Sequence, residues 1–375
     1  MTKKKILFLS GTRADFGKLK SLIRICVDSS LFEVHIFATG MHLQGRYGMT
    51  VKEIEKSGFE NIFRFINYTS ETTMDLTLSK TIDGLSSFIK ENQPDLIIVH
   101  GDRVEALAGA IVGALNNILV GHIEGGEVSG TIDELIRHSV SKLSHFHFVA
   151  NDLAKRRLIQ MGEVENQIFV IGSPDVDIMF SNDLPSLERA KSYYQVPFEK
   201  YAVLMFHPIT TEFEKIGNII ETLVDVILAD NSNYLVIYPN NDLGSSRILE
   251  EYARLDGNER IKIYPSLRFE YFLTFLKNSE FLIGNSSAGI REAPYYGLPS
   301  VNIGTRQNNR AESPSIIHTS YSYESIKEGI SKAKLNPVGM VQMTFGDGSS
   351  DEKFLSILKE EPLWDTSLQK LFKDI

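Results

Sequence analysis

The repeated alternation of short apolar runs with amphipathic stretches is the feature that most constrains the fold of this chain. In the first half, apolar runs such as Ile6–Ser10, Val34–Ala38 and Leu96–His100 are separated by helical patterns such as Val104–Leu115. Continuous apolar strands that alternate with helices are typical of a parallel sheet covered by helices on both faces. We therefore predict an α/β fold with doubly wound sheets.

The same pattern occurs twice along the chain. It loosens between Pro174 and Pro197, where Asn182, Asp183 and Pro185 read as a connector, and then it resumes from Ala202–Phe206 to Ser300–Ile303. A chain of 375 residues also exceeds what one core comfortably fills. We expect two Rossmann-like domains, 1–175 and 176–355, with an interdomain cleft and with ligands bound at the carboxyl ends of the strands.

Composition excludes several classes of protein. The formal net charge is −9, whereas a nucleic-acid-binding protein would be expected to present a basic face. The single cysteine, Cys26, cannot build a disulfide framework or a thiolate metal site within one chain. No apolar stretch approaches the roughly 20 residues of a membrane helix, and the run after the basic Met1–Lys5 is too short for a signal peptide. We expect a cytoplasmic protein with no membrane or nucleic-acid partner.

The turn Gly11-Thr12-Arg13 directly follows the first predicted strand and precedes a helix. A helix N-terminus offers unpaired N–H groups that suit a phosphate, and Arg13 and Lys18 add positive charge. An ordinary strand-to-helix turn with a solvated arginine explains the same residues. No G-x-G-x-x-G fingerprint follows, so a common dinucleotide site is not indicated.

The segment Gly284–Gly289 is a stronger candidate for binding a diphosphate. It follows the predicted strand Phe281–Ile283 and is expected to open a helix that carries Glu292. Small residues allow a ligand close to the backbone, Ser286 and Ser287 can donate to phosphate oxygens, and Glu292 can accept from ribose hydroxyls. A simple serine cap of the helix is the alternative.

Three carboxylates follow strand ends or open a helix in the first half. Asp102 and Arg103 follow the strand Leu96–His100, Glu124 follows Ile118–Gly121, and Asp133 begins the next helix. Carboxylates crowded into a poorly solvated cleft acquire raised pKa values and can act as general acids and bases. Each has a plainer reading alone, as an ion-pair partner or a helix cap.

His207 differs from the other histidines, because it ends the first strand of the second half and precedes Pro208. It could donate to a phosphate or move a proton, and a turn histidine is the competing interpretation. The remaining histidines show no metal-ligand spacing, and we expect no metal and no cofactor.

These segments together resemble the UDP-N-acetylglucosamine 2-epimerases. The resemblance covers nearly the whole chain in the same order, through Gly11–Lys18, His100–Arg103, His122–Thr131, Phe206–Pro208 and Gly284–Glu292. The run Glu124-Gly125-Gly126-Glu127 with Ser129-Gly130-Thr131 is similar to the hydrolysing branch, which makes sialic-acid precursors. The other branch typically has a Glu-Ala-Gly-Leu-Arg type of segment there.

The resemblance implies a fold of glycosyltransferase-B type, with a C-terminal helix in 356–375 that packs on the first domain. It implies that Asp102, Glu124 and Asp133 are catalytic carboxylates and that His207 shares catalytic and binding roles. It implies contacts of Arg13, His207, Ser286, Ser287, Glu292 and Arg306 with UDP, with Lys18 and Arg103 near the sugar or the phosphates. A dimer or tetramer is common in the family.

The expected reaction converts UDP-N-acetylglucosamine and water into N-acetylmannosamine and UDP, through a glycal formed by elimination of UDP. Four alternatives stay open at this point. They are a hydrolysing epimerase for a UDP-2,4-diacetamido-2,4,6-trideoxy sugar of legionaminic acid synthesis, a non-hydrolysing epimerase, a glycosyltransferase of the same fold, and an inactive UDP-sugar sensor.

Overall fold

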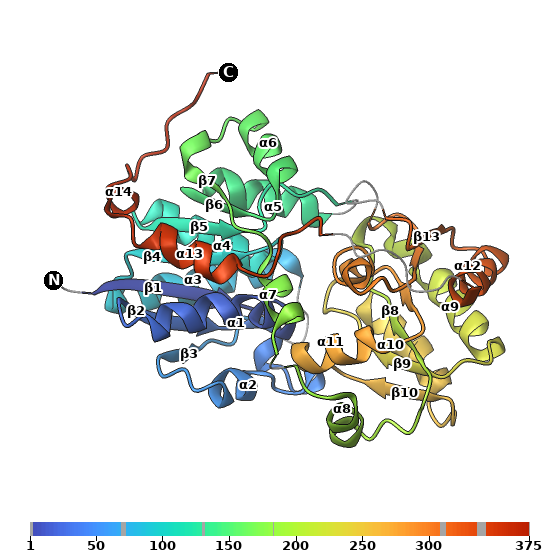
Figure 1. Ribbon diagram of the computed structural model, residues 1–375. Helices are drawn as coiled ribbons and strands as arrows, with labels where there is room; N and C mark the ends of the chain where they lie inside the picture. Colours follow the sequence, from blue (N-terminus) through green and yellow to red (C-terminus); the bar gives the residue numbers. More distant parts are fainter. Residues whose placement is uncertain are drawn as a thin grey trace. The chain divides into compact units, whose positions relative to one another are not determined.

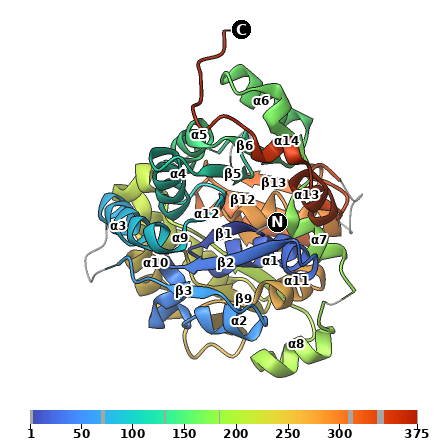
Figure 2. The same cartoon turned by 90° about the vertical axis from the view of Figure 1, so that its left-hand side faces the viewer.

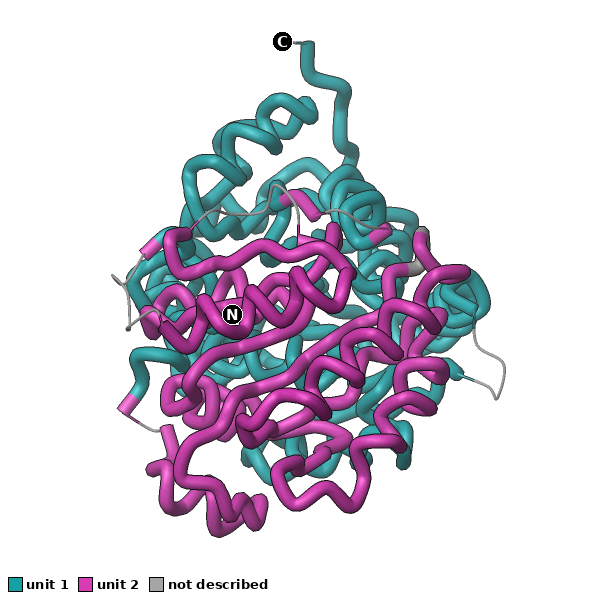
Figure 3. The backbone as a smooth tube through the Cα atoms, turned by 90° about the vertical axis from the view of Figure 1, so that its right-hand side faces the viewer, with its two compact units in different colours: residues 1–127, 133–181, 344–375 teal, residues 128–132, 182–343 magenta. Residues whose placement is uncertain are grey.

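The computed structural model describes residues 3–68, 73–129, 132–182, 184–307, 313–335 and 343–374. Asp183 of the predicted connector and Gly130 and Thr131 of the family motif lie outside this described part. The chain divides into two compact units. Unit 1 comprises Met1–Glu127, Asp133–Ser181 and Thr344–Ile375, and unit 2 comprises Val128–Ile132 and Asn182–Met343; Figure 3 colours them separately.

Unit 1 is built on a seven-stranded sheet in the order β3-β2-β1-β4-β5-β6-β7, in which all pairings are parallel. Its strands are β1 (Lys4–Ser10), β2 (Phe32–Ala38), β3 (Ile62–Arg64), β4 (Leu96–His100), β5 (Leu119–Ile123), β6 (Phe146–Val149) and β7 (Ile168–Val170). Its helices are α1 (Arg13–Asp28), α2 (Val51–Lys56), α3 (Met74–Asn92), α4 (Val104–Leu115), α5 (Ile132–Leu143), α6 (Asp152–Gln160), α7 (Pro174–Phe180), α13 (Ser350–Leu358) and α14 (Glu361–Trp364).

Helices cover both faces of this sheet. Successive side chains of a strand point to opposite faces, so Ile6 and Phe8 of β1 face one layer and Leu7 and Leu9 the other. Ile6 and Phe8 belong to a buried cluster with residues of α1 and with Phe354 of α13. Helices α1, α7 and α13 pack against one another, and Figures 1 and 2 both show them side by side. Helices α3 and α4 form a second pair, and α4 contacts β1, β4 and β5.

Unit 2 repeats this architecture with six strands in the order β10-β9-β8-β11-β12-β13, again with parallel pairings throughout. Its strands are β8 (Ala202–Met205), β9 (Tyr234–Ile237), β10 (Ile261–Tyr264), β11 (Leu282–Gly284), β12 (Ser300–Ile303) and β13 (Ile316–Thr319). Its α-helices are α8 (Leu187–Tyr194), α9 (Ile216–Ala229), α10 (Ser245–Tyr252), α11 (Phe269–Lys277) and α12 (Tyr323–Leu335). Helices α9 and α12 pack together on a core that includes β8, β9 and β12.

Each sheet has one point where the strand order reverses. In unit 1 it lies between β1 and β4, and in unit 2 between β8 and β11. Loops that leave the two strands of such a point run to opposite faces and open a crevice at the carboxyl edge. The predicted motifs that follow these four strands therefore occupy the positions where doubly wound sheets bind ligands.

The predicted α/β class with two parallel, doubly wound sheets is confirmed, and two strands were missed. These are β3 and β13, which are edge strands in their sheets. Edge strands are half exposed, and both carry polar or exposed side chains such as Arg64 and His318 in place of a continuous apolar run. The domain boundaries at 175 and 355 remain a proposal.

The helix predicted after β11 is wrong. Two short 3-10 turns, η6 (Ser287–Gly289) and η7 (Ala293–Tyr296), replace it, and Glu292 lies between them. Pro294 has no N–H to continue a helix, and Gly289 is a poor helix former. Near the C-terminus the chain forms α13 and the four-residue α14, so the expected segment 356–375 contains only the end of α13 and α14. No described helix is long and apolar enough to cross a membrane.

Candidate active site

The turn after β1 is held by an aspartate of α1. The Thr12 side chain accepts from the Asp15 N–H, and Asp15 accepts from the Gly11 and Thr12 N–H groups at 2.9 Å each. The amides that we expected to receive a phosphate are therefore already bound to a carboxylate. Arg13 forms an ion pair with Glu53 of α2. Its guanidinium is the positively charged group at this turn.

Lys18 and Glu124 form a buried ion pair. The Lys18 Nζ lies 3.2 Å from Glu124 Oε1, and both side chains are almost inaccessible to solvent. Two further polar atoms approach the same oxygen: Ser173 Oγ donates to it at 3.1 Å, and His100 Nε2 lies 3.4 Å away. Three polar side chains thus surround one oxygen of the carboxylate at the end of β5. This carboxylate is held in a fixed orientation.

The backbone of Glu124 is strained. Its φ of +67° lies in the left-handed region, which non-glycine residues rarely adopt. Its N–H donates to the Phe148 carbonyl at 3.1 Å, which fixes the end of β5 against β6. Two residues later Gly126, at φ +76°, passes so close to the Ala154 carbonyl that a Cβ would lie 2.3 Å from it. Such strain persists where the surroundings over-determine it, and it clusters at functional sites.

Asp102 is paired with an arginine that the sequence did not suggest. Arg137 of α5 is fully buried, donates to Asp102 Oδ2 and also lies 3.4 Å from the Glu127 carbonyl. Asp133 lies one helical turn before Arg137, so both project from the same side of α5. The Asp102–Arg137 contact thereby brings the start of α5 to the end of β4. Strands β4 and β5 are neighbours, so Asp102 and Glu124 follow adjacent strand ends.

Arg103 is the residue before α4 and points its Nε to Glu105 Oε2 at 3.4 Å. Glu105 is buried and also approaches Asn67 Nδ2 at 3.5 Å. It packs against Gly11 and Gly40, where an added Cβ would approach its side chain at 3.1 and 2.7 Å. Glu105 therefore links the loops that follow β1, β2 and β4.

The histidines of β5 and β6, His122 and His147, are buried in the core and form hydrogen bonds there. His122 Nε2 donates to the Gly101 carbonyl at 2.8 Å, its Nδ1 lies 3.0 Å from Ser141 Oγ, and burial lowers its pKa to about 3. Burial also lowers the pKa of His147, which lies 2.9 Å from Glu163. Both imidazoles are buried and hydrogen-bonded within unit 1, which fits a structural role.

In unit 2, one buried asparagine joins the loops at the strand-order reversal. Asn285 follows β11; its Oδ1 accepts from the His207 N–H at 2.7 Å and its Nδ2 donates to the His207 carbonyl at 2.8 Å. Its own carbonyl accepts from Arg306 Nη1 at 3.3 Å and from Gln307 Nε2 at 3.0 Å. Gly284 allows this close approach, because a Cβ there would lie 1.9 Å from the Met205 carbonyl.

The tautomer of His207 is fixed by the same network. Its Nδ1 accepts from the backbone N–H of Asn240 at 3.0 Å. In the neutral ring the proton must then reside on Nε2, which makes that atom a hydrogen-bond donor. A neutral His207 therefore carries a donor at Nε2, and its contact with a phosphate stays a prediction.

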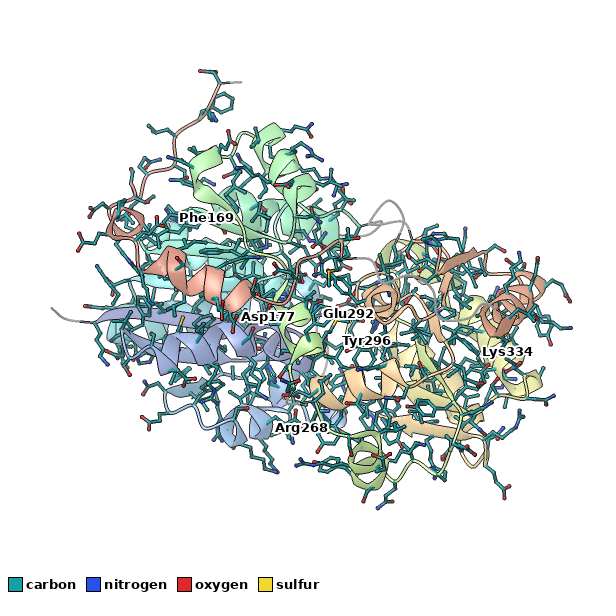
Figure 4. The ribbon with its side chains drawn as sticks, viewed as in Figure 1. Phe169, Asp177, Arg268, Glu292, Tyr296 and Lys334 are labelled. Carbon is teal, nitrogen blue, oxygen red and sulfur yellow. The ribbon has the colours of Figure 1, made fainter. Side chains whose placement is uncertain are left out.

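The remaining candidates of unit 2 lie on the loop after β11. The Ser286 side chain accepts from the Ala288 N–H at 3.3 Å, which is the capping role offered as the alternative reading. Ser287 is half buried, and Glu292 is buried. Figure 4 labels Glu292 and Tyr296 on this stretch. Because only short 3-10 turns follow β11, hydroxyls and amides rather than a long helix dipole would meet a phosphate here.

The sequence missed three residues that hold the candidates in position: Arg137, Ser173 and Asp175. An arginine one turn after Asp133 was the available signal for Arg137. Ser173 and Asp175 lie in the segment after β7; Asp175 falls within 174–197, which read as a connector, and Ser173 immediately precedes it. Among the residues that the structure describes, no group of three or more histidines, cysteines or carboxylates could hold a metal ion.

Solved structures place the fold among two-domain α/β proteins of glycosyltransferase-B type. The structure titled UDP-GlcNAc 2-epimerase of Methanocaldococcus jannaschii in complex with UDP-GlcNAc and UDP superposes with a TM-score of 0.79. It is 23% identical and the match covers 94% of this chain and 99% of that chain.

A family model described as UDP-N-acetylglucosamine 2-epimerase matches residues 25–359. The UDP-N-acetylglucosamine 2-epimerase of Neisseria meningitidis serogroup B is 46% identical, with 99% of each chain covered. The hydrolysing UDP-N,N'-diacetylbacillosamine 2-epimerase of Legionella pneumophila is 35% identical, with 98% of each covered. The chain belongs to the UDP-N-acetylglucosamine 2-epimerase family.

Proposed function

We propose that this protein is a hydrolysing UDP-N-acetylglucosamine 2-epimerase that converts UDP-N-acetylglucosamine and water into N-acetylmannosamine and UDP. The observation that carries the proposal is the buried Lys18–Glu124 pair beside the Asp102–Arg137 pair at adjacent strand ends. The identity of 46% to a UDP-N-acetylglucosamine 2-epimerase over 99% of the chain supports the substrate.

Carboxylates are needed because the C2 proton of the sugar is not acidic. Its removal is coupled to departure of UDP: a base takes the proton, the C2–H electrons form the C1=C2 bond, and the C1–O bond breaks. The glycal then gains a proton at C2 on the opposite face, and water adds at C1. One group cannot serve both faces, so Asp102, Glu124 and Asp133 share these proton transfers.

Hydrogen-bond donors are needed because the leaving diphosphate gains negative charge as the C1–O bond breaks. Nε2 of His207, the hydroxyls of Ser286 and Ser287 and the guanidinium of Arg306 supply donors in unit 2, and Arg13, Lys18 and Arg103 supply positive charge in unit 1. Donors that are already oriented stabilise developing charge without reorganisation. Buried Glu292 is assigned to the ribose hydroxyls.

Product analysis tests the proposal. The purified protein is incubated with UDP-N-acetylglucosamine, without added metal or acceptor, and the mixture is followed by 31P and 1H NMR. Free UDP and N-acetylmannosamine in equal amounts are expected. A UDP-linked 2-epimer would contradict the hydrolytic step, and sugar transfer only after an acceptor is added would identify a glycosyltransferase.

A second substrate has specific support. The 35% identical relative from Legionella is named for UDP-N,N'-diacetylbacillosamine, a diacetamido sugar nucleotide. The same assay with a UDP-2,4-diacetamido-2,4,6-trideoxy sugar decides between the two. A higher kcat/KM for that substrate would move the assignment to it.

A further inference from the structure

Asp175 forms a second carboxylate contact with the lysine that pairs with Glu124. Its Oδ2 lies 3.3 Å from Lys18 Nζ, and its side chain is 2% exposed. Lys18 therefore lies between two buried carboxylates, Glu124 from the end of β5 and Asp175 from the first turn of α7. In this region, which water barely reaches, one positively charged ammonium group faces two carboxylates.

The position of Asp175 is fixed by its own helix. Its Oδ1 accepts from the Val176 N–H at 3.0 Å, while Oδ2 faces Lys18. Asp175 lies in the first turn of α7, where the N-terminal end of a helix favours a negatively charged side chain. The same segment supplies Ser173, which donates to Glu124 Oε1 and whose N–H donates to the Phe345 carbonyl at 2.7 Å.

We propose that Asp175 is a positioning residue for the reaction, which shares Lys18 with Glu124 and so keeps Glu124 a stronger base than a full ion pair would allow. This inference rests on the proposed function, because it assigns a partner to a proposed catalytic carboxylate. Asp175 acts through Lys18 and does not itself contact the sugar.

The physical reason is that interactions between charges are strong where solvent is excluded. A lysine that pairs with one carboxylate alone stabilises its anion and weakens it as a base. A second carboxylate on the same lysine offsets part of that stabilisation. Lys18 from α1 and His100 from β4 face Glu124 directly, Asp175 from α7 reaches it through Lys18, and the Asp102–Arg137 pair follows the adjacent strand end.

The neighbouring Asp177 provides a matched control. It belongs to the same helix, but it accepts from Ser21 Oγ, from the Ser350 N–H and hydroxyl and from the Asp351 N–H. Figure 4 labels Asp177 on α7. An Asp177→Asn change therefore alters a half-buried carboxylate of α7 that contacts α1 and α13 and does not contact Lys18.

The experiment is the pH dependence of kcat/KM for the wild type, Asp175→Asn and Asp177→Asn. Loss of the charge at 175 removes one of the two carboxylates that face Lys18, so the limb of the pH profile that reports ionisation of Glu124 is expected to move to lower pH by about one unit. In Asp177→Asn the limb is expected at the wild-type pH. If the pH profile of kcat/KM for Asp175→Asn has this limb at the wild-type pH, the proposal is overturned, even if turnover falls.

Two additions keep the test decisive. If Asp175→Asn does not fold, Asp175→Ser removes the charge and keeps an oxygen near the Val176 N–H; the same shift is expected.

A titration of 13C-labelled glutamates, with Glu124 assigned through Glu124→Gln, needs no substrate. If the wild type releases no UDP, the proposed function fails, and this titration still decides whether Asp175 controls the proton affinity of Glu124.

Discussion

The two units share one architecture and present opposite chemistry at their strand ends. Unit 1 gathers buried ionic groups there: Lys18 with Glu124 and Asp175, and Asp102 with Arg137. Unit 2 gathers amides, hydroxyls and a histidine around Asn285, with Arg306 as the cation. Proton transfer requires groups that titrate, whereas a diphosphate requires hydrogen-bond donors. This contrast fits the proposed function, in which unit 1 supplies the proton transfers and unit 2 supplies most of the donors to UDP.

The largest expected effect is that of Glu124→Gln. Loss of a general acid or base typically costs 10²–10⁴-fold, so kcat is expected to fall by about a thousandfold. The dissociation constant of UDP, measured by calorimetry, is expected to change little, because the UDP donors of unit 2 are untouched. A comparable loss of UDP affinity would show that Glu124 itself takes part in binding the nucleotide and would break the division.

The reciprocal change is Asn285→Ala. It removes the two hydrogen bonds that hold His207, and UDP binding is expected to weaken about tenfold, equivalent to about 1.4 kcal/mol. Asn233→Ala is the matched control, because its side chain donates once to the Lys200 carbonyl elsewhere in unit 2. Equal weakening of UDP binding in both variants would mean that general destabilisation, and not the position of His207, is responsible.

The pH dependence of stability distinguishes the structural carboxylate Asp177 from the proposed catalytic carboxylates of unit 1. Burial raises the pKa of Asp177 to about 6, so folding favours its protonated form. The stability that this provides is complete below the ordinary value near 3.8 and is lost as the pH rises through about 6. The stability advantage of the wild type over Asp177→Asn should therefore shrink by up to about 3 kcal/mol between about pH 4 and 6.

Urea unfolding at a series of pH values measures this difference. Asp83→Asn, at an exposed position of α3, serves as the control for the aspartate-to-asparagine substitution itself. A stability difference between the wild type and Asp177→Asn that does not change with pH would show that Asp177 is ionised in the folded protein throughout this range.

The smallest expected effect is that of Ser173→Ala. It removes one donor to Glu124 Oε1, a contribution of about 1 kcal/mol, so kcat is expected to fall about fivefold with KM little changed. Ser139→Ala on α5 loses a hydrogen bond to the Leu135 carbonyl and should leave kcat at the wild-type value. An unchanged kcat in Ser173→Ala would show that the orientation of Glu124 does not depend on this hydroxyl.

The sequence predicted the repeated parallel architecture because buried strands leave continuous apolar runs. It also predicted which segments follow the strand ends, since topology places these at one edge. The spacing of Arg137 from Asp133 was a signal for Arg137, but its contact with Asp102 and that of Asp175 with Lys18 could not be predicted, because they join distant parts of the chain. Nor could it show that Asp15 occupies the amides at the start of α1, or that Asn285 and not a helix organises the loop after β11.

Proton exchange at C2 tests the central claim most directly. The protein is incubated with UDP-N-acetylglucosamine in deuterated water, and the released sugar is analysed by NMR. Proton removal and return by different carboxylates predicts N-acetylmannosamine with deuterium at C2, formed together with free UDP. A product that retains hydrogen at C2 would contradict the account, because the carboxylates of unit 1 would then not exchange the proton on which the reaction depends.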